Sequence, residues 1–298
     1  MAQNKKQKTK KEYEEWVDED TELAEEFSDK LNALFFRMLR NPSDKEMKDF
    51  QLMRDVLIAS FLLNFSKILE YQLEQSMNMG ISVADEQIKR LEIDKIVKKT
   101  INDKKYKKML DSVVLSNQET LAYVLYGIRV NTDNIIKDIK SNVIDTKKVI
   151  STELAEQFAE NGITEYEDKA GRKHKISDYI KQKSLDEITK IMRNSYFMEA
   201  TKYGVPYVRI IHLNIHPHCA LCEPFDNKIL ALDENDKGVM TLAEANRLGL
   251  FHPYCDDVPM AMELTDTFNQ DEIKISLNEE NKKRKVYNDK RGFKSFFG

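Results

Sequence analysis

The cysteines and histidines of this chain are concentrated in one short stretch. All three cysteines of the 298 residues, and four of the five histidines, lie between His212 and Cys255. Cys219 and Cys222 form a Cys-x-x-Cys pair, and a His-x-x-Cys pair ends at Cys255. Two chelating pairs of thiol and imidazole groups supply the four ligands of a tetrahedral zinc site. Scattered buried thiols, or a disulfide with one free thiol, are the alternatives, and the odd cysteine count argues against an oxidised framework.

The zinc interpretation names a complete ligand set. The expected metal ligands are Cys219, Cys222, His252 and Cys255. Four protein ligands leave no open position for water, so the predicted zinc is structural rather than catalytic. Metal binding of this kind supplies folding energy to a module that is too small to build a sufficient core of its own.

The other histidines leave alternatives open. His216 or His218 could replace His252 as a ligand, or could form an exposed catalytic zinc site. His252 is preferred because His-x-x-Cys is a compact chelate and because His218 directly precedes a cysteine. His212 is interpreted as a strand-surface residue, and His174 is distant in the sequence.

Catalytic motifs are missing from the sequence. It contains no His-Glu-x-x-His, no phosphate-binding Gly-x-x-x-x-Gly-Lys and no Gly-x-Ser-x-Gly. A zinc deaminase needs a His-x-Glu ahead of its cysteines, and that motif is also missing. A nuclease built on His216 and His218 with Asp226 lacks the rest of its motif. We therefore expect no enzyme, with neither catalytic nor cofactor-binding residues apart from the metal ligands.

Composition predicts a mainly α fold. Six prolines and nine glycines are few for this length, and no proline occurs between Pro42 and Pro206. A long proline-free stretch rich in lysine, glutamate, leucine and isoleucine is typical of long helices. The longest apolar run, 56–65, is about half of what a membrane span needs. The expected fold is a set of long N-terminal helices followed by a small α+β zinc-knuckle module at the C-terminus.

Charge blocks and helix signals divide the chain into four expected segments. These are a charged flexible arm over 1–26, a helical domain over 27–161, a hairpin, helix and zinc-binding module over 162–265, and a basic flexible tail over 266–298. Within the helical domain, Asn41-Pro42 ends one helix and Ser43-x-x-Glu46 opens the next. We expect a break at Met79-Gly80 and separate helices over 111–126 and 132–160.

The C-terminal half shows other local signals. Residues 163–167 and 172–176 predict a short β-hairpin, and a helix then begins at Ser177 and ends near Gly204. Residues 205–215 alternate like a strand that leads into the cysteine pair. Thr241-x-x-Glu244 predicts a capped short helix that ends at Gly249.

Two basic stretches are candidates for contact with nucleic acid. Lys95–Lys108 and Lys282–Lys294 are rich in lysine and arginine, but they lack a set of interleaved aromatic side chains for base stacking. A solvated surface is the preferred interpretation. Any binding to DNA is expected to be weak, independent of sequence and sensitive to salt.

The C-terminal third resembles a known family. The segment 219–228, CALCEPFDNK, and the segment 250–255, LFHPYC, are similar to the C-terminal signature of phage head-morphogenesis proteins. These are the minor head, or minor capsid, proteins of tailed phages, including the phage Mu F-like group. The resemblance covers about 163–262 and includes the hairpin around 168–172 and the helix that carries Tyr179 and Arg193.

The sequence departs from the family pattern at two places. Asn227 stands where the family usually has glycine, and asparagine also tolerates the left-handed conformation of such a turn. Asp256 and Asp257 follow Cys255, where the family often has another cysteine, and this difference favours His252 as the remaining ligand.

The resemblance implies a structural virion component rather than an enzyme. It implies a location in the capsid interior or at the portal vertex after synthesis in the host cytoplasm. Its implied partners are the portal protein and capsid or scaffold proteins, with packaged double-stranded DNA as a non-specific contact. It implies a role in head assembly and, in some members, in DNA ejection. The alternatives are a zinc-dependent, nuclease-like nucleic-acid-processing enzyme and a zinc-knuckle adaptor that binds nucleic acid.

Overall fold

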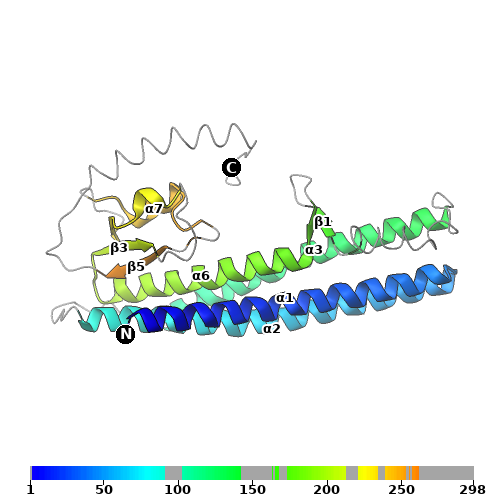
Figure 1. The fold of residues 1–298 in the computed structure, drawn as a ribbon, viewed down its shortest axis with the longest axis horizontal. Helices are drawn as coiled ribbons and strands as arrows, with labels where there is room; N and C mark the ends of the chain where they lie inside the picture. Colours follow the sequence, from blue (N-terminus) through cyan, green and yellow to red (C-terminus); the bar gives the residue numbers. More distant parts are fainter. Residues whose placement is uncertain are drawn as a thin grey trace. The chain divides into compact units, whose positions relative to one another are not determined.

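The structure is a computed structural model that describes residues 2–90, 103–141, 163, 165–167, 173–212, 221–233, 239–252, 255 and 257–261 (Figure 1). Most of these residues are helical, and a three-stranded antiparallel sheet lies near the C-terminus. The mainly α class predicted from the sequence is therefore confirmed. The chain divides into two compact units, residues 1–74 with 107–188 and residues 75–106 with 189–298.

Four long helices make up most of the described chain. They are α1 (Ala2–Arg40), α2 (Asp44–Arg90), α3 (Asp103–Lys140) and α6 (Ile176–Lys202). The predicted turn between the first two is confirmed, because α1 ends before Asn41-Pro42 and the Glu46 amide donates to Ser43 Oγ over 3.2 Å. This bond satisfies one of the donors that a helix start leaves without a partner.

The first helix corrects the prediction of a flexible arm over 1–26. Helix α1 begins at Ala2, and Tyr13, Val17 and Ala24 on it are buried. Spacings of four and seven residues place these side chains on one face, while most of the acidic residues between Glu12 and Glu26 lie on exposed positions. The charge block is therefore the solvated side of an amphipathic helix.

The predicted break at Met79-Gly80 is also wrong, because α2 continues through both residues. A β-carbon at Gly80 would collide with the Ser195 hydroxyl and the Met192 carbonyl oxygen of α6. Ser76 and Ala84, one turn before and after Gly80, are fully buried. The glycine thus belongs to a column of small residues that lets two helix backbones approach closely.

Helix α3 is continuous where the sequence predicts two helices with a boundary between 126 and 132. Thr132 is tolerated inside it because its hydroxyl bonds to the carbonyl oxygens of Ile128, at 3.0 Å, and Arg129, at 2.9 Å. Bonds of this kind hold a threonine side chain inside a helix without an unsatisfied buried hydroxyl.

The core of the first unit contains aromatic pairs among many aliphatic side chains. Helices α1 and α2 run side by side in Figure 1, and the Phe27 and Phe61 rings stack with centroids 4.6 Å apart. Phe35 meets Phe50 edge-on at 5.6 Å. Such pairs add stabilisation beyond the apolar area that they bury.

A buried ionic cluster joins α2 to α3 in the same unit. Arg54 is 1% exposed, and its Nη1 donates to Thr132 Oγ1 and to Asp133 Oδ1, each over 2.7 Å. A buried guanidinium needs such partners because its charge has lost water. The cluster fixes α2 against α3 at one point along their length.

The predicted hairpin is confirmed in the first unit. Strands β1 (Glu165–Glu167) and β2 (Lys173–Lys175) pair antiparallel, with Tyr166 opposite His174. Helix α6 follows directly and ends before Gly204, whose φ of 74° is the left-handed geometry that ends many helices.

The small sheet belongs to the second unit. Strands β3 (Tyr207–His212), β4 (Ile229–Ala231) and β5 (Asp257–Ala261) pair antiparallel in the order β4-β3-β5. Between them lie the 3₁₀ turn η1 (Glu223–Phe225) and helix α7 (Leu242–Arg247). The core of this unit contains residues from α6, from the strands and from the turns: Tyr196, Ala200, Val208, Ile210, Phe225, Leu230 and both described cysteines.

Some predictions fall outside the described residues. These concern the basic stretch over 95–102, the helix end at 161–162 and the tail over 266–298. Among the described helices, none is both long and apolar enough to cross a membrane.

Candidate metal centre

The first cysteine turn is built on the end of β3 and on η1. Cys222 precedes η1, and the Phe225 amide donates to its carbonyl oxygen over 2.8 Å. Phe225 is fully buried and anchors the turn in the core. The chain then reverses at Asn227, whose φ of 57° confirms the left-handed turn expected there. Cys222 is held as a buried side chain at a fixed position by these contacts.

The second ligand turn follows α7. The Thr241 hydroxyl and the Glu244 carboxylate form the capping box predicted from the sequence. Helix α7 ends at Arg247, two residues before Gly249, which has a φ of 104°. A β-carbon at Gly249 would come within 3.6 Å of the Leu221 side chain, so the end of α7 lies against the first cysteine turn. The fold therefore brings together two motifs that are separated in the sequence.

Three of the four predicted ligands meet between these turns. The ligand atoms of Cys222, His252 and Cys255 all lie within 4.8 Å of one another. The two Sγ atoms are 3.2 Å apart, much farther than in a disulfide bond, so the two cysteines are not joined by one. Bond lengths of 2.0 to 2.3 Å to a tetrahedral zinc place ligand atoms about 3.3 to 3.8 Å apart. The three side chains could hold a metal ion of this size with small adjustments.

The other candidate metal ligands are not among the residues that the structure describes. Cys219, the fourth predicted ligand, is one of them, and so are His216 and His218. The choice among these three as the fourth ligand therefore stays a prediction. His252 itself lies in the cluster, as expected from its spacing to Cys255.

An acidic side chain lies next to the cluster. Asp257 is 1% exposed; its Oδ2 is 3.5 Å from Cys255 Sγ, and its Oδ1 is 3.0 Å from His212 Nδ1. The interpretation of His212 as a strand-surface residue is wrong, because its side chain is only 8% exposed. The His212 amide also donates to Asp226 Oδ1 over 3.1 Å. Carboxylates and histidines in such positions orient metal ligands.

An arginine also contacts the second turn. Arg193 on α6 donates from Nη1 to the Cys255 carbonyl oxygen over 3.3 Å, and its guanidinium lies 4.7 Å from the centre of the Phe251 ring. Phe251 adopts a φ of 59°, which is unusual for a bulky residue. Contact with Arg193 and with Phe197 holds this strained residue directly before His252.

The surroundings of Cys255 lower the pKa of its thiol. A hydrogen bond with Cys222 holds the pKa of the Cys255 thiol below its ordinary value, while burial and the Asp257 carboxylate act in the opposite direction. A thiolate is the form that binds metal. The positive charge of Arg193 nearby also lowers the pKa of this thiol.

Sequence reasoning did not assign roles to the residues around the ligands. His212, Arg193 and Asp257 were each noted, but their contacts with the ligand turns were not predicted. A usable signal was present only for Asp257, because it lies two residues after Cys255. No comparable signal in the sequence connects Arg193 on α6 with Cys255.

The chemical types of the three ligands indicate which metal ion the site would bind. Two thiols and an imidazole are typical ligands of zinc and are poor ligands for magnesium or calcium. Both thiols are buried, with Cys222 2% and Cys255 8% exposed.

Comparison with protein-family models, with curated proteins and with solved structures finds no match for this chain.

Proposed function

We propose that the cluster is a structural zinc site and that Cys219 supplies its fourth ligand. The support is the meeting of Cys222, His252 and Cys255 within 4.8 Å. Cys219 is three residues before Cys222, and a Cys-x-x-Cys turn directs both sulfurs to one ion. Zinc bound in this way crosslinks two turns of a small module.

The proposed role of the chain is that of a minor head protein of a tailed phage. The single observation that carries it is the meeting of the two motifs that resemble the head-morphogenesis signature, Cys-x-x-Cys and His-Pro-x-Cys. In this role the protein is a structural component near the portal vertex. It contacts portal, capsid or scaffold proteins during head assembly and accompanies the delivery of DNA.

The proposal includes no catalysis at the zinc. A zinc enzyme keeps one coordination position open for water or substrate, whereas four protein ligands close the shell. The burial of both described thiols supports a closed site. The main competing function is a zinc-dependent nuclease that uses His216 or His218.

Contact with packaged DNA is part of the proposal only as a non-specific interaction. Lys104, Lys105, Lys107 and Lys108 are exposed near the start of α3. Lysines of this kind contact phosphates through charge alone, so binding would weaken steeply as salt increases.

Particle composition tests the proposed role. Portal, coat and scaffold genes from the genome that encodes this chain would be expressed with it, and assembled heads would be purified and analysed by mass spectrometry. We expect the protein in heads at low copy number, and expect the Cys255→Ser variant to be depleted from them. Finding the wild-type protein absent from heads that assemble normally without it contradicts the role.

A cleavage assay separates the competing nuclease. Zinc-loaded wild-type protein is incubated with linear and circular double-stranded DNA, and His216→Ala and His218→Ala serve as variants. We expect no cleavage by any of the three proteins. Metal-dependent cleavage that one histidine variant abolishes, with zinc content unchanged, would establish the nuclease instead.

A further inference from the structure

The outward face of α2 carries no charge over about three helical turns. Leu52, Val56 and Leu63 are 67%, 62% and 55% exposed, and Ala59 between them is also exposed. Spacings of four, three and four residues place these side chains on one stripe, about 17 Å long. In a chain with 33% charged residues, every exposed position of α2 from Leu52 to Asn64 is uncharged. Stripes of this kind mark interaction surfaces.

This apolar stripe is separate from the face that packs the first unit. Phe61, Phe65 and Leu69 of the same helix are 2% to 3% exposed, and Phe61 stacks on Phe27 of α1. Helix α2 is therefore apolar on two faces. Only its inner face is covered by described residues of its own chain, and a helix that is apolar on several sides is normally buried on them.

Charged residues bound the stripe in a definite order. Lys45, Lys48 and Asp49 precede it, Lys67 and Glu70 follow it, and all five are exposed. Their spacing from Leu52 and from the end of the stripe keeps them on the same face of the helix. Read along α2, the face runs from basic to acidic, through the apolar stripe, and then from basic to acidic again.

We propose that this face pairs with the same face of a second copy of the chain. The two α2 helices run antiparallel about a two-fold axis that passes midway between Leu57 and Ile58. A two-fold interface is self-complementary, because each residue contacts a residue that makes the reciprocal contact. The inference concerns self-association and does not depend on the zinc site or on the proposed role.

The apolar side chains are complementary in this arrangement. The axis places Leu52 opposite Leu63 of the second copy, and Val56 opposite Ala59. The central layers therefore pair a larger with a smaller side chain, while the outer layers pair leucine with leucine. Seams of apolar residues with alternating four- and three-residue spacing are the usual contact between long helices.

The charged side chains fix the direction. In the antiparallel arrangement Lys45 lies opposite Glu70 of the second copy. Asp49 lies close to Lys67, whose direct counterpart in the register is Lys48. In a parallel arrangement each of these residues would face its own copy, so that like charges would oppose one another. Charge complementarity thus favours the antiparallel pairing.

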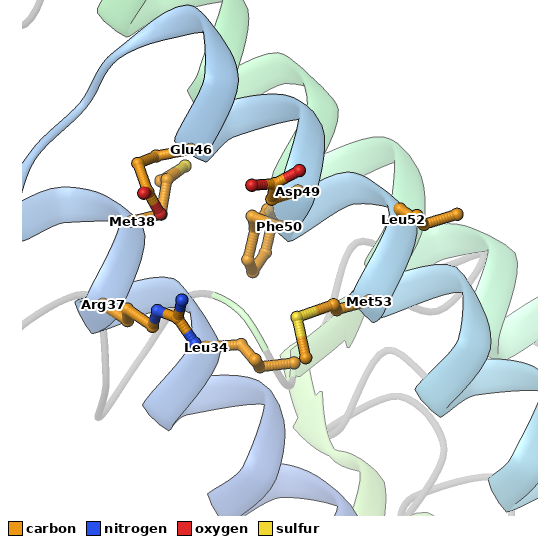
Figure 2. Close-up of a pocket in the computed structure, with 8 residues that line it drawn as sticks. All are labelled: Leu34, Arg37, Met38, Glu46, Asp49, Phe50, Leu52 and Met53. Carbon is orange, nitrogen blue, oxygen red and sulfur yellow. The ribbon is translucent and has the colours of Figure 1, made fainter.

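A pocket lies where the charged and apolar parts of the face meet. Its volume is about 260 Å³, and it opens between α1 and α2 (Figure 2). Glu46 and Asp49 of α2 border it, and Arg37 of α1 lies on the other side. The antiparallel register brings Lys67 of the second copy to this end of α2, where the two carboxylates can accept its ammonium group.

A neighbouring helix offers a comparison surface. Helix α3 also exposes apolar side chains, with Leu115 56% and Tyr126 60% exposed. Charged residues interrupt this face, because Glu119 and Arg129 are exposed between and beside the apolar positions. Leu115 is therefore a matched control for Leu63, which has nearly the same exposure.

Sedimentation of the full chain tests the surface. Sedimentation equilibrium over a concentration series would measure the dimer dissociation constant of wild type, Leu63→Arg and Leu115→Arg, with helix content checked by circular dichroism. We expect a reversible wild-type dimer, at least roughly tenfold weaker association for Leu63→Arg, and no change for Leu115→Arg. A monomer at every concentration overturns the proposal, as does a dimer that only Leu115→Arg weakens.

Charge reversal tests the direction. Lys45→Glu and Glu70→Lys each create two repulsive contacts, so each is expected to weaken the dimer roughly tenfold. The double variant Lys45→Glu/Glu70→Lys restores both attractive contacts and is expected to associate like the wild type. If the two helices were parallel, like charges would still oppose one another in the double variant. A double variant that does not regain the association of the wild type therefore overturns the antiparallel pairing.

Discussion

In the first unit, aromatic and aliphatic side chains along α1 and α2 repeat the same kind of contact turn after turn, from Tyr13 to Phe35 on α1 and from Phe50 to Leu73 on α2. The C-terminal module instead has strands of only three to six residues and places two thiols without a disulfide bond in its core. Many equivalent contacts tolerate the loss of one. A small core with one crosslinking point does not, because much of its stability depends on that point.

The largest expected effect is loss of the module when its metal is lost. Cys255→Ser should abolish zinc binding and unfold the region after about residue 205, because structural zinc contributes about 10 to 16 kcal/mol of apparent binding energy, comparable to the whole stability of a domain. Helices α1 and α2 should stay folded. Elemental analysis for zinc and hydrogen exchange of the two regions measure both parts.

Further variants sharpen the assignment of the ligands. Cys219→Ser should behave like Cys255→Ser, whereas His174→Gln, in the hairpin, should keep about one zinc per chain and normal exchange. If Cys255→Ser reduced protection from hydrogen exchange equally in the C-terminal module and in helices α1 and α2, the module would not depend on zinc more than the helices do. Zinc retained in Cys219→Ser but lost in His216→Ala or His218→Ala would assign a histidine as the fourth ligand.

Disrupting the ionic cluster around Arg54 is expected to destabilise the first unit rather than the C-terminal module. Burial by itself raises the pKa of Asp133, but hydrogen bonds from Arg54 and Gln51 outweigh it and hold the pKa below its ordinary value. Arg54→Ala removes the buried guanidinium and should cost the first unit roughly 2 to 4 kcal/mol, because it leaves partly buried carboxylates without their partner. Urea denaturation measures this loss.

The control for this variant is Arg129→Ala. Arg129 pairs with Asp55 at 3.2 Å, but it is 50% exposed, so its loss should cost at most about 1 kcal/mol. Both variants should keep the zinc content of the wild type. If Arg54→Ala lost zinc as readily as Cys255→Ser, the two regions would be stabilised together rather than separately.

The smallest effect is a pH dependence that belongs to α1. Burial raises the pKa of Asp20 from 3.8 to about 7, although a hydrogen bond from Gln72 acts against this rise. Between about pH 4 and 7 the folded chain keeps a proton that the unfolded chain has released, so the free energy of unfolding falls as pH rises through this range. The slope is at most about 1.4 kcal/mol per pH unit.

Substitution at the buried carboxyl isolates this contribution. Asp20→Asn should remove the slope and should be more stable than the wild type above pH 7, as measured by urea denaturation at several pH values. Asp18→Asn, at an exposed position of the same helix, should leave the slope in place. A wild-type slope of the opposite sign, with stability rising through this range, would contradict the raised pKa.

Local signals in the sequence predicted much of the fold. The capping boxes at Ser43 and Thr241, the left-handed Asn227 and the glycine after α6 each act over a few neighbouring residues, so their consequences can be predicted from spacing alone. The hairpin and the meeting of the Cys222 and Cys255 turns were also anticipated. In each case the residues that act are close together or form a recognisable pair of motifs.

Contacts between distant segments could not be predicted in the same way. A glycine within a helix looks like a break until the helix that it contacts is known, as for Gly80. The acidic run before Phe27 hides the buried side of α1, because the few apolar residues there gain their meaning from packing on other helices. The pairing of His212 with Asp257 depends on strand register, which no local pattern specifies.

The close contact at Gly80 also limits movement along the helix axis. If α2 moved by one turn against α6 within the second unit, Ser76 or Ala84 would take the place of Gly80, and either residue would bring a β-carbon against the Met192 carbonyl oxygen. The contact therefore admits one axial position of α2 and excludes the two positions one turn away. A displacement applied to one end of α2 would then pass to α6 as a shift of the whole helix rather than being lost by sliding.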